Sequence, residues 1–262
     1  MEVVVCLKHV IDETQLKVDR ANNKIIFEGA KTKISDDDKN AIEEAVKIKE
    51  KNGGTVTAIC LGNADAKKSL KEALAMGCDK GRLLVDASFQ DMDAIRTALV
   101  LSVAIKKIGK YDLVITSTGT TDVYSGIVGP SLAEFLQVPE LGFVSKLEVV
   151  APNKVRVERL LEDGVEVDEC ETPVVLTVAR EINQPRFPTL IQIMGAGKKE
   201  MLEWDAKALE IDPSSIGKSG SKVHVESVDV PRSARKKLLF ESSPEEATEK
   251  LADALLKEGV VK

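Results

Sequence analysis

A run of hydroxyl and glycine residues follows the apolar segment 112–117, within DLVITSTGTTDVYSGIVGPSLAEFL. Five of its residues carry short hydroxyl groups: Ser117, Thr118, Thr120, Thr121 and Ser125. Three are glycines, which let a backbone approach a ligand closely: Gly119, Gly126 and Gly129. No Lys or Arg lies between residues 117 and 129, so a phosphate bound here would be held by amides and hydroxyls, as in an anion nest. A loop that merely caps the next helix fits the spacing equally well, because neither a G-x-G-x-x-G nor a Walker A lysine is present.

Short apolar runs alternate with helical patterns in the first half of the chain. The runs are rich in β-branched residues and cover 3–8, 55–62, 81–86 and 112–117. There are four helical patterns. The first follows Ser35, the second follows Asn63, the third covers about 91–109, and the fourth follows the pair Gly129-Pro130. Strict alternation of this kind predicts a doubly wound, mostly parallel α/β sheet, with ligands bound beyond the carboxyl ends of the strands.

After residue 140 the apolar residues alternate by twos as far as about 179, which predicts an added β hairpin or meander. Prolines, glycines and serines recur from about Arg180, and the chain closes with a capped helical pattern over 243–259. We therefore expect a nucleotide-binding α/β domain over 1–185 and a recognition loop with a C-terminal arm over 186–262. The arm is expected to order only against a partner subunit from about residue 200, with disorder as the alternative.

Composition excludes several classes of protein. The net charge of −6 argues against general nucleic-acid binding, which needs a basic face. The four cysteines form no C-x-x-C and the two histidines have no ligand-spaced companions, so we expect reduced thiols and no metal site. No apolar run approaches membrane-spanning length, and the chain begins MEVVVCLKHV without a targeting pattern. We expect a cytoplasmic protein that does not span a membrane.

Several motifs occur in the order typical of one family. Residues 155–199 read VRVERLLEDGVEVDECETPVVLTVAREINQPRFPTLIQIMGAGKK. This segment resembles the signature of the electron transfer flavoprotein beta subunit, in which V-E-R precedes a hairpin, P-x-V-x-T-V closes a strand, and N-x-P-R-Y/F-x-T-L-x-x-I-M follows. VVVCLKHVID, AIEEAVKIKEKNGGTVTAICLG and KEALAMGCDKGRLLVD are similar to earlier family segments. The resemblance thus covers essentially the whole chain.

The resemblance implies a Rossmann-like fold of the adenine-nucleotide alpha-hydrolase type and a heterodimer. In the family, an alpha subunit carries an FAD that shuttles electrons, and the beta subunit binds AMP or, in bifurcating members, a second FAD. The expected nucleotide contacts are Cys6, Ser35, Asp38, Leu61, Gly62, Ser117, Thr118, Gly119, Thr120, Thr121, Asp122, Ser125, Gly126, Ile127, Val128 and Gly129. The family's usual G-R/K-Q-A-I is replaced by residues 117–121, whereas Asp122 and 128–130 agree with its pattern. Asp122 is expected either to bond ribose or to cap the loop.

The choice between FAD and AMP turns on DAIRTA at 93–98. Bifurcating members carry a D-T-x-A-T segment here, where a threonine meets the pyrophosphate. This chain keeps Asp93 and Thr97 and adds Arg96, whose charge suits a pyrophosphate, although a solvated helix residue is the alternative. We favour FAD, with AMP as the other occupant. With FAD, the complex is expected to oxidise NADH and divide the electrons between acceptors such as ferredoxin and a quinone-linked oxidoreductase. We assign no catalytic residue to the chain.

Residues 186–199 form a second site, expected to dock a partner dehydrogenase or oxidoreductase. Its apolar residues are Leu190, Ile191, Ile193 and Met194, in a stretch followed by two lysines. The resemblance places Leu190 on the family's recognition loop, and burial against the chain's own sheet is the alternative. Arg159 matches a family arginine at the interface between subunit and flavin, but Leu160 stands where many members have an acidic residue.

Two other classes of protein share the alternating pattern. A universal-stress-type nucleotide-binding module would need neither a flavin-bearing partner nor the segment 186–199. A synthetase of the adenine-nucleotide hydrolase type would carry an S-G-G-x-D-S-like loop after the first strand, and CLKHVIDET offers no such loop.

Overall fold

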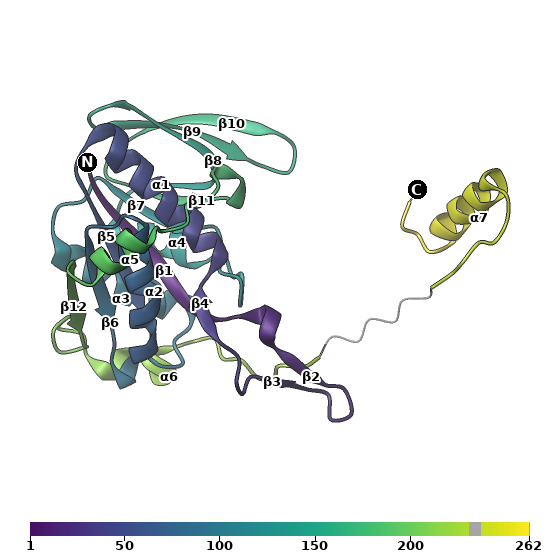
Figure 1. Cartoon of the computed structure of the whole chain (residues 1–262), viewed down its shortest axis with the longest axis horizontal. Helices are drawn as coiled ribbons and strands as arrows, with labels where there is room; N and C mark the ends of the chain where they lie inside the picture. The colour runs from purple at the N-terminus through teal and green to yellow at the C-terminus, as the bar shows by residue number, and fades with distance from the viewer. Residues whose placement is uncertain (231–236, 262) are drawn as a thin grey trace.

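A twisted sheet forms the centre of the computed structural model, which describes residues 1–230 and 237–261 (Figure 1). Within the described residues it has ten strands in the order β10-β9-β8-β11-β7-β1-β5-β6-β12, with β4 paired to β1 outside this path. Its parallel core consists of β1 (Glu2–Ile11), β5 (Thr55–Leu61), β6 (Lys80–Leu84), β7 (Leu113–Ser117), β11 (Val174–Val178) and β12 (Glu200–Trp204). The chain winds from β1 first to one side and then to the other, which confirms the doubly wound fold predicted from the alternating pattern.

Helices cover both faces of this sheet. On one face lie α1 (Asp36–Asn52) and α2 (Lys67–Met76), whose apolar residues, such as Ile42 and Leu70, share a core with β1 and β5. On the other face lie α3 (Ala94–Ile108) and α4 (Val128–Leu136), which pack through residues such as Val100 and Leu132. Short 3-10 turns connect several elements: Glu13–Gln15, Ala64–Ala66, Ala87–Phe89, Arg180–Ile182 and Pro213–Ser215.

The predicted meander is an antiparallel extension of the sheet. β8 (Glu140–Ala151), β9 (Lys154–Leu160) and β10 (Val165–Glu171) pair in succession and form the upper part of Figure 1. β11, the last strand of the region predicted as a hairpin or meander, lies instead between β7 and β8 and is parallel to both. All five of its residues are buried, as expected for a strand covered on both faces.

Three short strands were not predicted. β2 (Lys17–Asp19) and β3 (Lys24–Ile26) form the hairpin that projects from the body in Figure 1, and β4 (Thr32–Ile34) pairs antiparallel with the end of β1. Strands of three residues carry too few positions for a period of two to be recognised. β4 matters for the site because its last residue, Ile34, is fully buried and directly precedes Ser35.

The folded body continues beyond residue 186, where the sequence pattern placed the start of the arm. Helix α5 (Leu190–Ala196) is followed by β12, which joins the sheet parallel to β6. Ala206, Leu209 and Ile216 are buried in the core cluster that also contains residues of α3 and α4, and α6 (Gly217–Gly220) follows them. The expectation that residues from about 200 order only against a partner is therefore wrong for 200–221. Apolar residues here are too irregularly spaced to show a period.

The predicted C-terminal helix is α7 (Pro244–Lys257), with Ser243 accepting a hydrogen bond from the amide of Glu246. None of its residues is buried, and Figure 1 draws it apart from the sheet. Across the described ranges, no helix combines the length and apolar character needed to cross a membrane.

A pair of truncations tests where the folded body ends. A chain of residues 1–199 lacks β12 and the buried Leu209 and Ile216, and each such side chain contributes about 2 kcal/mol through burial. We expect its free energy of unfolding in urea to fall by several kcal/mol. A chain of residues 1–224 keeps these contacts and should unfold close to the full-length protein. Equal stability of the two truncated chains would contradict the boundary.

Candidate functional site

The end of β1, the start of α1 and the loop after β7 meet at the carboxyl edge of the sheet. The backbone of Lys8 is held from both sides: its amide donates to Asp38 Oδ2 at 2.7 Å, and its carbonyl accepts from the Ser35 amide at 3.1 Å. Ser35 Oγ in turn accepts from the Thr121 amide at 3.1 Å. Ser35 therefore ties the loop to the helix rather than capping α1 through its side chain.

Asp38 is the buried polar centre of this junction. Its Oδ1 lies 2.5 Å from Ser117 Oγ, and burial raises the pKa of the carboxyl group to about 7. The Ser117 hydroxyl also lies 3.0 Å from the Gly119 carbonyl, but its single hydrogen can serve only one acceptor. When Asp38 is protonated, it can donate to Ser117 Oγ while Ser117 donates to Gly119, and both groups are satisfied. The protonated form thus suits the geometry.

Lys8 is a site residue that the sequence analysis missed. Its Nζ lies 2.6 Å from Asp122 Oδ2, so a positive charge reaches the loop from β1 although the loop itself has none. Asp122 Oδ1 accepts from the Thr120 hydroxyl at 2.7 Å and from the Val123 amide at 2.9 Å, so Asp122 caps the loop. Strand register places Lys8 beside Leu61, and Gly62 follows immediately. Cys6, two residues before Lys8, is buried, and burial raises the pKa of its thiol.

The loop offers donors that suit an anion. Helix α4 has no side-chain cap at its N-terminal residue Ile127, and the preceding Ser125 and Gly126 are exposed. Thr121 Oγ1 is buried and has no hydrogen-bond partner among the described residues. Uncapped helix amides, an unpaired hydroxyl and a nearby lysine together fit a phosphate-bearing ligand. Beside the loop lies a cleft of about 300 Å³, lined in part by Thr118, Tyr124 and Arg180.

The three loop glycines differ in what they do. Gly126 has φ +66°, a left-handed conformation that favours glycine. A Cβ on Gly129 would lie 2.2 Å from Thr177 Cγ2, so glycine here allows α4 to pack against β11. A Cβ on Gly119 would meet the ring of Tyr124 at 2.9 Å. Contact of Gly119 and Gly129 with a ligand, like that of Val128, stays a prediction.

The segment at the start of α3 contacts the C-terminal part of the body. Asp93 caps the helix by accepting from the Arg96 amide at 2.8 Å, and Arg96 Nε donates to the Gly220 carbonyl at 2.6 Å. Thr97 donates its amide to the carbonyl of Asp93. A second cleft, of about 650 Å³, opens here between residues 87–91 and 213–224. In this structure Arg96 holds the 217–220 turn. The predicted contact of Arg96 and Thr97 with a pyrophosphate stays a prediction.

The residues predicted to bind partners lie in two places. Leu190, Ile191, Ile193 and Met194 are 73%, 83%, 55% and 71% exposed, so they are not buried against the chain's own sheet. They belong to α5, which begins with a capping box between Thr189 and Gln192. Arg159 lies in the β8–β10 extension, where its Nε donates to the Gly142 carbonyl and its Nη1 contacts Glu166 and Asp168.

The pKa of Asp38 predicts a pH dependence of stability. Because its folded value of about 7 lies above the unfolded value near 3.8, the folded protein retains a proton that the unfolded chain loses. This contribution is fully present below about pH 4 and is lost as pH rises through 7, by up to about 4 kcal/mol. Asp38→Asn mimics the protonated form, since its amide can donate to Ser117 Oγ. Urea unfolding between pH 5 and 8 should show a smaller decrease in the variant than in the wild type, whereas parallel curves would exclude Asp38 as the titrating group.

Comparison with known proteins shows the family of this chain. Residues 23–209 match the electron transfer flavoprotein domain. The chain is 40% identical over 256 residues to the electron transfer flavoprotein subunit beta of Thermoanaerobacterium thermosaccharolyticum, covering 97% of this chain and 98% of the relative. It is 40% identical to the subunit beta of Clostridium acetobutylicum and 34% identical to the caffeyl-CoA reductase-Etf complex subunit CarD of Acetobacterium woodii, over 86% of each chain in both pairs. The chain therefore belongs to the electron transfer flavoprotein family, as a beta subunit.

Proposed function

We propose that this chain binds an adenine nucleotide, FAD or alternatively AMP, where β1, α1 and the loop after β7 meet, and that it works as a heterodimer with an electron transfer flavoprotein alpha subunit. The observation that carries the proposal is the approach of Lys8 to a loop whose helix start has no side-chain cap. The net charge of the protein is −6, but backbone amides and one lysine can still balance the charge of a phosphate locally.

The protein's own residues would place and hold the nucleotide. Ser35 and Asp38 fix the loop through Thr121 and Ser117, while Lys8 and the amides near Gly126 would face the phosphates. FAD, when bound, supplies the electron transfer, and the chain supplies orientation and electrostatics. FAD is favoured over AMP by the acidic cap and the basic residue at the start of α3, with electrons passing from NADH or a dehydrogenase to acceptors such as ferredoxin or a quinone-linked oxidoreductase.

The exposed helix α5 is proposed as the docking site for the partner dehydrogenase or oxidoreductase. Its four large apolar side chains are exposed, and so is Phe187 just before the helix, at 95%. The relative CarD is named as a subunit of a reductase complex, which supports assembly of this kind. Helix α7, which has exposed Leu251 and Leu256, and the described residues after 221 are proposed to dock on the alpha subunit, together with Arg159 in the extension.

A charged substitution in the loop tests nucleotide binding. Gly126→Asp sets a carboxylate against the phosphates, and like charges about 4 Å apart repel by about 4 kcal/mol at an effective dielectric of about 20. We expect binding to weaken more than a hundredfold, so that the purified heterodimer loses the beta-site nucleotide and keeps the alpha-subunit FAD. Bound FAD and AMP are counted by chromatography after acid release.

Gly126→Asn is the matched control, because asparagine has the same size and tolerates the left-handed conformation without the charge. It should retain most of the nucleotide. If the Asp variant keeps a full complement of nucleotide, the loop is only a turn.

Truncation of one apolar residue tests docking. Leu190→Ala should slow electron exchange with the oxidoreductase that co-purifies with the wild-type heterodimer, since losing a central anchor costs about 2 kcal/mol or more, roughly thirtyfold in affinity. Nucleotide content should not change. Leu202→Ala, at an exposed position on β12, serves as the control. Unchanged exchange rates in the Leu190 variant would remove the docking assignment.

A further inference from the structure

Helix α5 is too short to be stable by itself. It has seven residues, of which only Ala196 is buried, and its large apolar side chains face solvent. Isolated helices of this length do not form appreciably in water, and the capping box of Thr189 and Gln192 satisfies only two backbone groups. Contacts outside the helix must therefore hold it.

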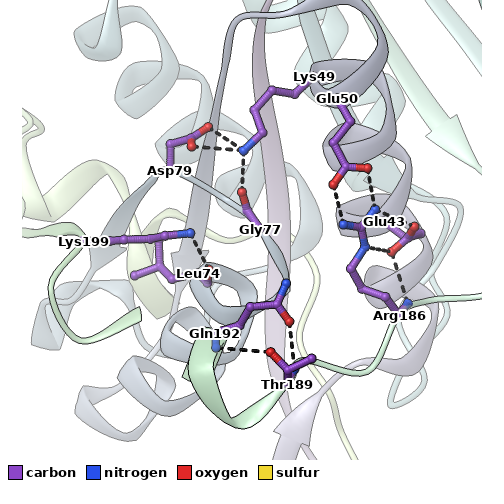
Figure 2. Close-up of polar contacts among 10 residues, drawn as sticks. All are labelled: Glu43, Lys49, Glu50, Leu74, Gly77, Asp79, Arg186, Thr189, Gln192 and Lys199. Atoms are coloured by element: carbon purple, nitrogen blue, oxygen red, sulfur yellow. Dashed lines mark hydrogen bonds and ion pairs between the residues drawn. The ribbon is translucent and has the colours of Figure 1, made fainter. Parts of the chain in front are cut away.

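Before α5, the chain is clamped to α1 by Arg186 (Figure 2). Its Nε and Nη2 donate to the Glu43 carboxylate at 2.8 and 3.1 Å, and its Nη1 and Nη2 donate to the Glu50 carboxylate at 2.5 and 2.9 Å. The Arg186 amide also donates to Glu43 Oε2 at 3.1 Å. The side chain of Glu43 is only 5% exposed, whereas that of Glu50 is 53% exposed, so the forked, charge-assisted contact with Glu43 is the buried half of the clamp.

A second pair of side chains extends the clamp towards the nucleotide site. Asn183 Nδ2 donates to the Asn40 carbonyl and to Glu44 Oε2, both at 3.0 Å. Asn40 Nδ2 returns a bond to the Asn183 carbonyl at 2.8 Å. The segment before α5 is thus fixed along more than one turn of α1.

After α5, Lys199 attaches the chain to the end of α2. Its Nζ donates to the carbonyls of Leu74 at 2.8 Å and Cys78 at 2.7 Å, and the contact with Leu74 is drawn in Figure 2. A cation at the C-terminus of a helix also interacts favourably with the helix dipole. The short helix is therefore held on both sides by charged side chains, one bound to α1 and one bound to α2.

We propose that Arg186 is a positioning residue that keeps α5 ordered before a partner arrives, with Lys199 as the second anchor. That an ordered α5 helps docking rests on the proposed function of α5 as a docking site. A surface that is already ordered loses less conformational entropy on binding, so the clamp strengthens docking without touching the partner. Arg186 affects docking only by ordering α5, and Leu190 is expected to contact the partner.

Hydrogen exchange in the purified heterodimer tests the clamp directly. Arg186→Gln should speed amide exchange in 190–196 by roughly tenfold or more, the change expected from losing charge-assisted hydrogen bonds. Arg156→Gln is the matched control, because Arg156 also forms a forked pair, with Glu169, in the β9–β10 hairpin. It should leave exchange in 190–196 unchanged. Arg186→Lys keeps the charge but loses the fork and should be intermediate.

If Arg186→Gln alone does not fold, the double variant Glu43→Gln/Arg186→Gln replaces it in the exchange measurement, because it leaves no unpaired buried charge. Unchanged exchange in α5 in the folded variant, or an equal increase with Arg156→Gln, would overturn the proposal.

A double-mutant cycle connects the clamp to docking. With the co-purified oxidoreductase, Arg186→Gln should raise KM several-fold and leave kcat unchanged, and the effect should largely vanish when Leu190 is already alanine. Additive effects would show that Arg186 does not act through α5. If Leu190→Ala alone has no effect, the docking function fails, while the exchange measurement still decides the clamp.

Discussion

Helix α1 carries four buried polar side chains, Asp38, Asn40, Glu43 and Glu44, beside the apolar residues that pack on the sheet. Buried polar groups are costly unless they are hydrogen-bonded, so each one requires a partner from elsewhere in the chain. Asp38 takes Ser117 and the Lys8 amide, whereas Asn40, Glu43 and Glu44 take the segment 180–186. One helix thereby sets the position of both the loop after β7 and the chain that leads to α5.

Charge is distributed differently at the two sites. At the loop after β7, a single lysine from β1, Lys8, lies among amides and hydroxyls and forms an ion pair with Asp122. Around α5, Arg186 contacts Glu43 of α1 and Lys199 contacts the end of α2, while the large apolar side chains of α5 are exposed. The first arrangement suits an anionic ligand, and the second suits a protein surface that buries apolar area.

Elements with a strong period were predictable, and elements without one were not. The buried runs at 3–8, 55–62 and 112–117 and the helices α1 to α4 follow directly from apolar spacing. β4, β12 and α5 are short, and each depends on a neighbour: β4 on β1, β12 on the edge of β6, and α5 on the anchors at its two ends. The loop after β7 was recognisable from its hydroxyls and glycines, but Lys8 was not, because it lies more than a hundred residues away in the chain.

The sequence by itself determined the fold class, the family and the polar loop, because local periodicity and ordered motifs are properties of neighbouring residues. Only the tertiary structure decided what the charged residues do. The fold buries Glu43 and Glu44 against residues 183–186, and it brings the Gly220 carbonyl within hydrogen-bond distance of Arg96. Hydrogen bonds between residues more than a hundred positions apart depend on how the sheet and its helices pack, which no local pattern records.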